Sequence, residues 1–343
     1  MKLENMQLSI SNRIATVTIK TKDRPMNVLT VDLLRELSAV LDIVEKEANC
    51  LVIFGEGKHF SPGADIQAMV RMDADRGEEF SRLGQDLTKK IEELTAPVII
   101  AIQGYAMGGA VEIALACDIR IAAESAVFGQ PEINIGVLPG WGGSQRLPRV
   151  VGLSKAKELI YTGRKIDAKE ALSIGLVDLV VPDDMLRPAA MGIAENIIEK
   201  PRVALATAKC AINALFDLPM SEGMKVERRL WRELFNTSDK KEGMTAFLEK
   251  RKPVFSDRMD EFEDIRRYIK QVSADYRKVH QLENRNHVNP EIKNPFNNLY
   301  IATAQNIMNY LLMFHQVSQD IARRNFEIAT SMFFPQRGPE KPA

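Results

Sequence analysis

Two short apolar runs, CLVIF at residues 50–54 and VIIAI at 98–102, restrict the fold of this chain more than any other feature of its sequence. The first ends in a Gly-Glu-Gly turn and the second directly follows a proline. Short apolar runs bounded by turn residues are typical of buried strands. Amphipathic helical periodicity over about 31–47 and 77–95 precedes and separates them. Strands that alternate with helices predict an α/β layer structure.

The remainder of the first 256 residues continues this pattern and then becomes entirely helical. We expect a β-hairpin, one more helix and two more strands, at residues 7–20, 109–116, 118–122 and 177–181. From 183 to about 251 only helical patterns occur, and Pro253 and Ser256 mark an end. The sequence therefore predicts an α/β core, a helical region and a helical extension, at residues 1–195, 196–256 and 257–343.

The extension carries apolar residues at helical spacing. A first helix has a narrow apolar seam with 3-4-3-4-3 spacing, formed by Phe262, Ile265, Ile269, Val272, Tyr276 and Val279. After an Asn- and Pro-bearing break at 284–298, a second helix continues in similar register with Ala304, Ile307, Leu311, Phe314 and Ile321. Such a pair predicts a helical hairpin or a bundle with other subunits. The segment after Phe334 has the composition of a disordered end.

The balance of positive and negative charges excludes a net electrostatic field of the whole protein as the way in which it binds a charged ligand. Lys plus Arg number 46 and Asp plus Glu also number 46, so we expect no nucleic acid partner and an anionic ligand held by local groups. No run of 18 residues is free of charged or strongly polar groups, which predicts no membrane-spanning helix. The chain passes from Met1 into a strand-like alternation without a leader. Three scattered cysteines, Cys50, Cys117 and Cys210, are expected to be buried thiols, and we predict a cytoplasmic protein.

Glycines at two strand ends suggest a site for a developing negative charge. Gly108 and Gly109 lie between an expected strand and an expected helix, where backbone without side chains can approach a ligand. The first N–H groups of that helix have no intrahelical acceptor, and the helix dipole is positive there. Such groups suit an oxygen that gains negative charge. The Gly63-Ala64 turn is placed to supply a second N–H from another loop.

Two glutamates accompany these glycines. Glu112 lies about one turn into the same helix, and Glu132 lies in a loop framed by glycine and proline. Two carboxyl groups in different environments can act as acid and base when one is desolvated enough to stay protonated. A solvated or ion-paired role is the more common one for an acidic residue beside glycines. A nucleotide site has little support, because neither G-x-G-x-x-G nor the P-loop pattern is present.

Four collinear stretches carry a longer pattern: FSPGADI, IQGYAMGGAVEIALACDIRIA, FGQPEINIGVLPGWGGSQRLPR and EGMTAFLEKRKPVF. In order and spacing they resemble the enoyl-CoA hydratase (crotonase) family, over about residues 5–255. The resemblance implies the crotonase fold, an α/β core of repeated ββα units wound into a spiral with a C-terminal helical trimerisation region. It also implies a homotrimer or a dimer of trimers. The helical hairpin-like extension is not explained by it.

The resemblance implies a role for each candidate site residue. The oxyanion hole for the thioester carbonyl falls on the backbone N–H groups of Ala64 and Gly109. Glu112 would orient and deprotonate water, and Glu132 would deliver a proton to the α-carbon. Substrate-binding positions are Gly63, Asp65, Ile66, Gln130, Gly140, Trp141, Phe247 and Lys250. We expect no metal and no cofactor, because the coenzyme A thioester is itself the substrate.

Some positions depart from the family pattern or allow a second interpretation. Hydratases commonly carry a lysine after GADI that is associated with the phosphates of coenzyme A, and this chain has Gln67. Lys250 falls on a position that in relatives reaches coenzyme A across a trimer interface, but a solvated helix end explains it nearly as well. We expect His59 to be a surface or packing residue. The remaining histidines lack the spacing of metal ligands, and these are His280, His287 and His315.

The predicted function is the reversible addition of water to a 2-trans-enoyl-CoA, giving a 3-hydroxyacyl-CoA, by a lyase of fatty acid metabolism. The alternatives in the same superfamily are an enoyl-CoA isomerase and a cyclic dienoyl-CoA hydratase, and the presence of both glutamates favours hydration. A non-enzymatic scaffold would have eroded motifs, and none is eroded here. For residues 257–343 two interpretations stay open, a hairpin packed on neighbouring subunits and an interaction module for a further partner.

Overall fold

A computed structural model of the chain describes residues 3–258, 260–270 and 272. The described residues belong to one compact unit, Met1–Val272. Several predictions for the extension lie outside them: the seam positions Tyr276 and Val279, the break at 284–298, the second helix, the disordered end, and the histidines at 280, 287 and 315.

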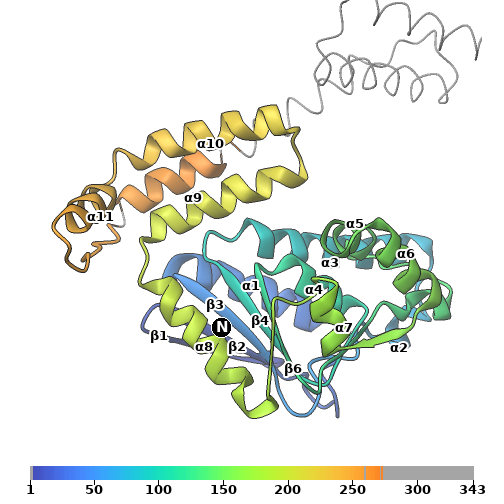
Figure 1. Cartoon of the computed structure of the whole chain (residues 1–343). Helices are drawn as coiled ribbons and strands as arrows, with labels where there is room; N and C mark the ends of the chain where they lie inside the picture. The colour runs from blue at the N-terminus through green and yellow to red at the C-terminus, as the bar shows by residue number, and fades with distance from the viewer. Residues whose placement is uncertain (1–2, 259, 271, 273–343) are drawn as a thin grey trace, which may run out of the picture. The chain divides into compact units, whose positions relative to one another are not determined.

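A six-stranded sheet with the order β1-β2-β3-β4-β6-β9 forms the centre of the unit (Figure 1). Its strands are β1 (Met6–Ser11), β2 (Ile14–Ile19), β3 (Cys50–Gly55), β4 (Val98–Ile102), β6 (Ile119–Ala123) and β9 (Leu179–Val181). The pair β1–β2 is antiparallel, and every other neighbouring pair is parallel. The predicted hairpin and the two buried apolar strands are therefore confirmed.

Helices cover both faces of this sheet. The helices α1 (Val31–Glu47), α3 (Ala74–Glu93) and α4 (Gly109–Ala116) share one apolar cluster with Leu51 and Ile53 of β3. The alternate residues of the same strand, Val52 and Phe54, belong to a second cluster with α8 (Leu186–Ile198). Successive side chains of a strand point to opposite faces. The uninterrupted apolar run at 50–54 is thus explained by burial on both sides.

A second sheet, with the order β5-β7-β8, was not predicted from the sequence. Its strands are β5 (Tyr105–Met107), β7 (Val127–Gly129) and β8 (Lys165–Asp167), each three residues long. Segments this short carry too few positions for an alternation to be recognised. This sheet matters because β5 leads directly into α4.

The remaining described elements are short helices around the core and a helical arm after it. Around the core lie α2 (Ile66–Met69), η1 (Pro131–Ile135), α5 (Gly143–Val151), α6 (Leu153–Thr162), α7 (Ala168–Ser173) and η2 (Asp183–Met185). The helical arm comprises α9 (Arg202–Asn213), η3 (Ala214–Phe216), α10 (Met220–Leu234) and α11 (Ser238–Leu248). The arm agrees with the prediction of purely helical structure after residue 183.

A buried lysine attaches the arm to the core. Lys209 of α9 is 8% exposed, and its ammonium group donates to Asp118 Oδ2 at 2.7 Å. The same group donates to the carbonyl oxygens of Ile91 and Ala96, each at 3.2 Å. A buried ammonium is tolerated only when its charge and its donors are satisfied in this way.

The start of the extension is helical and packs on the same unit. Residues 260–270 form helix, and the four described seam residues are at most 8% exposed, namely Phe262, Ile265, Ile269 and Val272. The Arg202 guanidinium lies 3.6 Å from the centroid of the Phe262 ring. Arg266 Nε lies 2.7 Å from Glu45 Oε1 at the end of α1. This part of the predicted seam is confirmed.

In the part of the chain that the structure describes, no helix is long and apolar enough to cross a membrane. The same residues include no group of His, Cys, Asp and Glu side chains suited to hold a metal ion. None of the three cysteines forms a disulfide, and burial raises the pKa of the Cys50 thiol to about 12. Cys117 is buried as predicted. Cys210, in α9, is only partly buried, so the prediction of a buried thiol was wrong for this residue.

The ion pair between Arg266 and Glu45 offers a test of how the extension docks. Replacing Arg266 by Ala should lower the free energy of unfolding by about 1–3 kcal/mol, since it leaves a largely buried carboxylate without its guanidinium partner. Urea denaturation of the full-length protein measures the change. Arg267→Ala is the matched control on the same helix, because Arg267 pairs with Asp264 where both side chains are at least 70% exposed, and its loss should be nearly neutral. Equal effects of the two substitutions would contradict the docking.

Candidate active site

The loop that carries Ala64 runs alongside β5, the strand that leads into α4. Ser61 and Ala106 form a parallel β-bridge, and the N–H of Met107 donates to the carbonyl oxygen of Ser61 at 3.1 Å. Gly63 has a φ of 101°, and a Cβ at this position would lie 2.7 Å from the carbonyl oxygen of Met107. Only glycine permits this conformation and this approach. The turn at 63–64 is thereby brought against the start of α4.

Two backbone N–H groups at this junction have no hydrogen-bond acceptor among the described residues. One belongs to Gly109, the first residue of α4, and the other to Ala64. The nitrogen of Gly109 lies 3.8 Å from the place that a Cβ on Gly63 would take, so the two loops are in contact. The positive end of the α4 dipole adds to the field at this point. The pair suits an oxygen that gains negative charge.

Glu112 lies one turn into α4 and is 2% exposed. Its Oε1 accepts hydrogen bonds from the N–H groups of Trp141 and Gly143, both at 2.7 Å. Because Gly143 is the first residue of α5, the carboxylate also lies at the positive end of that helix. Burial raises the pKa of Glu112 to about 7, against the opposing effects of these two N–H groups and of the Arg146 guanidinium.

Glu132 lies in η1, directly after β7. A Cβ on Gly108 would lie 3.0 Å from Glu132 Oε1, so this carboxyl group lies over the glycine that precedes α4. With its nitrogen turned toward Glu132, the side-chain amide of Gln130 donates to Oε1 at 2.7 Å and to Oε2 at 3.0 Å. Burial raises the pKa of Glu132 to about 7, and the negative charge of Glu112 contributes to the rise.

The side chain of Gln130 lies close to both carboxyl groups. A Cβ on Gly143 would lie 2.9 Å from the Gln130 amide and also 2.9 Å from Glu112 Oε1. The negative charge of Glu112 contributes to the raised pKa of Glu132, so the two carboxyl groups lie near enough to interact. Such a pair can supply a base and an acid in the same step.

The residues predicted after Ala64 form a capped turn. Asp65 caps α2 by accepting hydrogen bonds from the N–H groups of Gln67 and Ala68, at 3.1 and 3.3 Å. Its other oxygen accepts a hydrogen bond from Arg24 at 3.0 Å, and Arg24 also reaches Gln67 Oε1 at 3.4 Å. Ile66 is 51% exposed. This turn fixes the chain direction immediately after the Ala64 N–H.

The other predicted binding residues fall into two groups. Gly140 and Trp141 lie at the site, where the Gly140 carbonyl oxygen accepts from Ser81 Oγ at 2.6 Å and the Trp141 ring is buried. Phe247 lies in α11 and Lys250 just after it, and the Phe247 side chain is 82% exposed. In Figure 1 the arm end labelled α11 lies away from α4 and α5. Within one chain, these two residues are not brought to the carboxylate pair.

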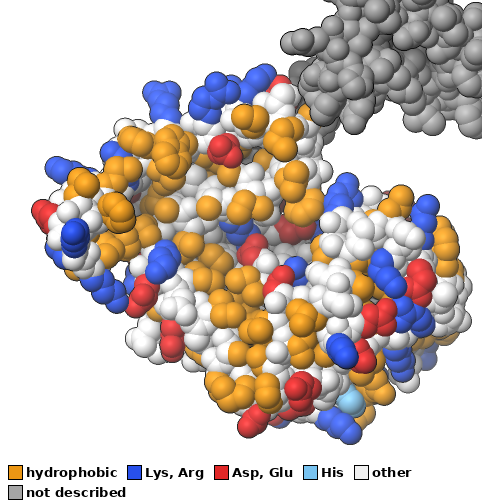
Figure 2. Space-filling view, in the orientation of Figure 1, with side chains coloured by type: hydrophobic (Ala, Val, Ile, Leu, Met, Phe, Trp, Pro, Cys, Tyr) orange, Lys and Arg blue, Asp and Glu red, His pale blue; other side chains and the backbone are white. Residues whose placement is uncertain are grey.

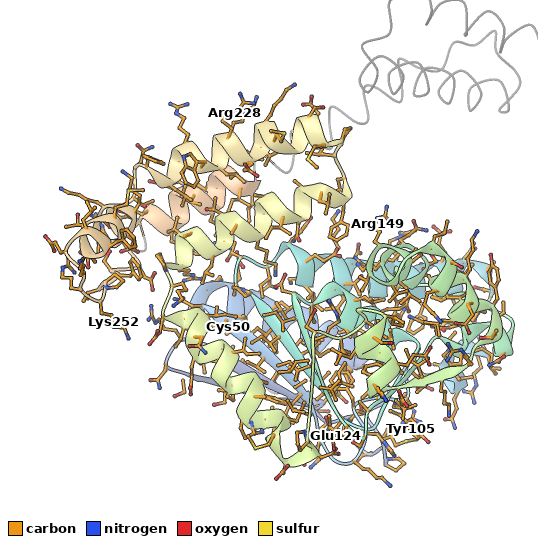
Figure 3. All side chains as sticks on the ribbon, in the orientation of Figure 1. Cys50, Tyr105, Glu124, Arg149, Arg228 and Lys252 are labelled. Carbon is orange, nitrogen blue, oxygen red and sulfur yellow. The ribbon has the colours of Figure 1, made fainter. Side chains whose placement is uncertain are left out.

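His59 is a packing residue, as predicted. Its ring stacks on Tyr105 with centroids 4.6 Å apart, and its Nδ1 accepts a hydrogen bond from the Tyr105 N–H at 3.2 Å. Figure 3 shows Tyr105 at the edge of the molecule. This contact supports β5 at the end opposite to Gly109 and adds no group to the carboxylate pair.

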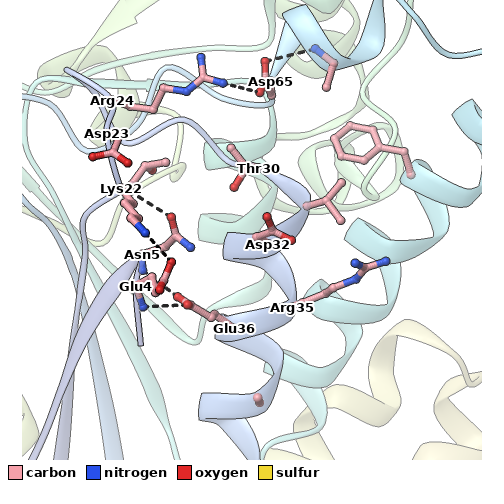
Figure 4. A pocket seen from close by; sticks show the side chains of 15 residues that line it. Glu4, Asn5, Lys22, Asp23, Arg24, Thr30, Asp32, Arg35, Glu36 and Asp65 are labelled. Atoms are coloured by element: carbon pink, nitrogen blue, oxygen red, sulfur yellow. Dashed lines mark hydrogen bonds and ion pairs between the residues drawn. The ribbon is translucent and has the colours of Figure 1, made fainter. Parts of the chain in front are cut away.

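A cavity of about 850 Å³ adjoins α2 and the first turns of α1 (Figure 4). Its charged lining consists of Lys22, Arg24 and Arg35 together with Glu4, Asp23, Asp32, Glu36 and Asp65. Neither Glu112 nor Glu132 lines it. Because acidic side chains outnumber basic ones, the lining does not by itself favour an anion. The candidate site is therefore formed by the carboxylate pair and its N–H groups rather than by this cavity.

Sequence reasoning missed two side chains that hold the site together. Asn27, 5% exposed, donates through Nδ2 to the carbonyl oxygens of Glu56 and Phe60, each at 2.9 Å, and so holds the loop that leads to Ala64. Arg146 donates to the carbonyl oxygen of Trp141 at 3.0 Å and is paired with Glu92. Arg146 stands inside one of the quoted stretches, whereas no local pattern singles out Asn27.

Comparison with known proteins agrees with this geometry. A family model described as enoyl-CoA hydratase/isomerase matches residues 9–258. The short-chain-enoyl-CoA hydratase of Clostridium acetobutylicum is 42% identical over 255 residues, which are 74% of this chain and 97% of that protein. The crotonyl-CoA hydratase of Syntrophomonas wolfei is 42% identical over 258 residues, 74% of this chain and 99% of that protein. The crystal structure of an enoyl-CoA hydratase from Bacillus anthracis superimposes with a TM-score of 0.71 at 36% identity, covering 74% of this chain and all of that one.

The raised pKa of Glu112 makes a prediction about stability. A carboxyl group whose pKa is higher in the folded state contributes stability that is full below its unfolded value and is lost as the pH rises through about 7. Glu112→Gln keeps an oxygen for the two N–H groups and cannot ionise. At pH 8 the free energy of unfolding of this variant should therefore be about 1–3 kcal/mol higher than that of the wild type. Below pH 4.5 the two free energies of unfolding should become equal.

Thermal and urea unfolding between pH 4 and 8.5 measure this difference. Glu124→Gln is the control, because Figure 3 shows Glu124 at the protein surface, and it should show no such pH-dependent gain. A Glu112→Gln variant that is less stable than the wild type at pH 8 would contradict the burial argument.

Proposed function

Because the chain belongs to the enoyl-CoA hydratase/isomerase family, we propose that it is an enoyl-CoA hydratase, which adds water reversibly to a 2-trans-enoyl-CoA to give a 3-hydroxyacyl-CoA. The observation that carries the proposal is the pair of carboxyl groups with pKa values of about 7 beside two N–H groups that lack acceptors. Both features are needed for hydration, since water is a poor nucleophile and the double bond must first be polarised.

The N–H groups of Ala64 and Gly109 polarise the substrate. They bind the thioester carbonyl oxygen, which gains negative charge as the β-carbon is attacked and the enolate forms. Removing one donor from an oxyanion hole typically costs about 10²–10³ in rate. The Gly63 conformation supports this role, because it brings the two donors onto neighbouring loops.

The two glutamates divide the proton transfers. Glu112 accepts two N–H bonds and is influenced by the positive charge of Arg146, so we assign the negative charge to Glu112 and the proton to Glu132. Ionised Glu112 removes a proton from water while the water oxygen bonds to the β-carbon. Glu132 gives its own proton to the α-carbon. One C–O and one C–H bond form, the double bond becomes single, and the reverse reaction exchanges the roles.

The presence of two glutamates also favours hydration over isomerisation, the other reaction in the name of the family. An isomerase moves a double bond with a single acid–base group and no added water, whereas this site holds two coupled carboxyl groups. The curated relatives named above are hydratases of short-chain and crotonyl thioesters, so we propose a short acyl chain for this enzyme as well. Product mass separates the two reactions, since only hydration adds one water to the substrate.

The proposed function also includes an oligomer, in which the arm of one subunit contacts a neighbouring subunit. Figure 2 shows hydrophobic side chains exposed over the arm. On α10 and its C-cap they form one stripe, with Met220, Met224, Trp231 and the C-cap residue Phe235 each at least 47% exposed. Exposed apolar patches of this kind mark contacts between proteins. We propose that the arm packs in a homotrimer or a dimer of trimers, in which Phe247 and Lys250 serve a neighbouring subunit's substrate.

We also propose a reducing compartment such as the cytosol, because none of the three cysteines forms a disulfide. One relative is described as a probable mitochondrial enoyl-CoA hydratase of Dictyostelium discoideum.

Substitution of either glutamate tests the proposed chemistry. Glu112→Gln and Glu132→Gln should each lower kcat on crotonyl-CoA by about 10²–10⁴-fold, because each removes one proton-transfer group. Binding of the saturated analogue butyryl-CoA, measured by calorimetry, should change little. Glu124→Gln should remain at wild-type activity. Near-normal turnover in either site variant would remove that residue from the mechanism.

The pH profile of the wild type should be bell-shaped, with kcat/KM highest near pH 7. The rising limb reports ionisation of the base and the falling limb reports loss of the proton from the acid. Glu112→Gln should flatten the rising limb and Glu132→Gln the falling limb. Steady-state kinetics from pH 5 to 9 measure both, and an unchanged profile in the two variants would argue against the division of roles.

A further inference from the structure

The indole ring of Trp141 lies between two glycines from different helices. A Cβ on Gly84 of α3 would lie 2.1–2.4 Å from the indole atoms Cγ, Cδ1 and Cδ2. A Cβ on Gly109 of α4 would lie 2.3–3.1 Å from Cζ3, Cε3 and Cη2 at the other end of the ring. The ring therefore spans the gap between α3 and α4, and neither glycine can carry a side chain while it is there. Phe80 packs edge-on against it at 5.3 Å.

The backbone of Trp141 is held on both sides of its side chain. Its N–H donates to Glu112 Oε1 at 2.7 Å. Its carbonyl oxygen accepts hydrogen bonds from Thr88 Oγ1 and from Arg146 Nη1, each at 3.0 Å. Thr88 belongs to α3 and Arg146 to α5. One residue thus contacts three helices and both chemical parts of the site.

We propose that Trp141 is a positioning residue, which sets the Glu112 carboxylate against the N–H of Gly109 by holding the first through its backbone and supporting the second with its ring. Trp141 is 3% exposed as a residue, so its ring contacts protein rather than substrate. This inference rests on the proposed function, in which Glu112 must reach water at the β-carbon while Gly109 holds the carbonyl oxygen of the same molecule. A misplacement of about 1 Å can cost roughly 10²-fold in rate.

The first test separates positioning from substrate contact. Trp141→Ala should lower kcat on crotonyl-CoA by about tenfold to a hundredfold and leave KM within about threefold. The rising limb of the kcat/KM profile should move to higher pH, because loss of the ring loosens the N–H bond that favours ionised Glu112. Trp141→Phe keeps a ring against Gly84 but loses the contact with Gly109. It should lose less kcat than Trp141→Ala and should have a higher free energy of unfolding than that variant.

The second test uses two glycines of the same helix. Gly84→Ala should lower kcat about tenfold or more, since its methyl group must displace the indole. Gly77→Ala is the matched control, because a Cβ on Gly77 meets no atom within 4 Å, and it should keep wild-type kinetics. In the Trp141→Ala background, Gly84→Ala should cost nothing further, since the methyl group then enters vacated space.

The outcomes distinguish this inference from the proposed function. A wild type that hydrates no enoyl-CoA overturns both. With an active wild type, variants that lose thermal stability but keep kcat and the pH profile overturn the inference alone, since the ring then only packs. A rise in KM with unchanged kcat also overturns it, because the ring would then be a substrate contact. Additive losses in the double variant would show that Gly84 acts by another route and would overturn it as well.

Discussion

The site depends on two hydrogen bonds from the N–H groups of Trp141 and Gly143 to one oxygen of Glu112. A carboxylate that is 2% exposed would be strongly driven to its neutral form by the loss of water alone. The two donors, the start of α5 and Arg146 oppose that drive and leave the pKa at about 7. The base is thus poised at neutral pH because α4 and α5 meet at this point.

Several glycines are required because the backbone must pack closely against the two carboxyl groups and the Trp141 ring. A side chain on Gly143 would lie 2.9 Å from Glu112 Oε1, and one on Gly108 would lie 3.0 Å from Glu132 Oε1. Each carboxyl group therefore occupies space that only glycine leaves open. Gly109 and Gly84 leave the space that Trp141 fills. These residues let backbone, carboxyl groups and the indole ring approach one another closely, and Gly108 also adopts a φ of 53°.

Much of this arrangement is predictable from the sequence, and the missing part has a physical cause. The hairpin, α1, β3 and β4 follow from local periodicity, and the carboxylates and the N–H groups follow from the resemblance of four stretches. The strands β5, β7 and β8 are too short to show a pattern. The buried ring of Trp141 and the hydrogen bonds of Asn27 depend on contacts between distant segments, on which single-sequence reasoning has no information.

The extension makes a contact that lies outside the family match, which ends at residue 258. The three relatives named above are covered to 97–100% of their length by about three quarters of this chain, yet the helix at residues 260–270 packs on the same compact unit. Glu45 is the meeting point, since it accepts hydrogen bonds from Thr95 of the core, Arg202 of the arm and Arg266 of the extension. The arm's orientation on the core is therefore fixed partly by residues beyond the family's own boundary. In the proposed oligomer the arm carries Phe247 and Lys250 to a neighbour, so the docked helix would influence a site in which it has no residue.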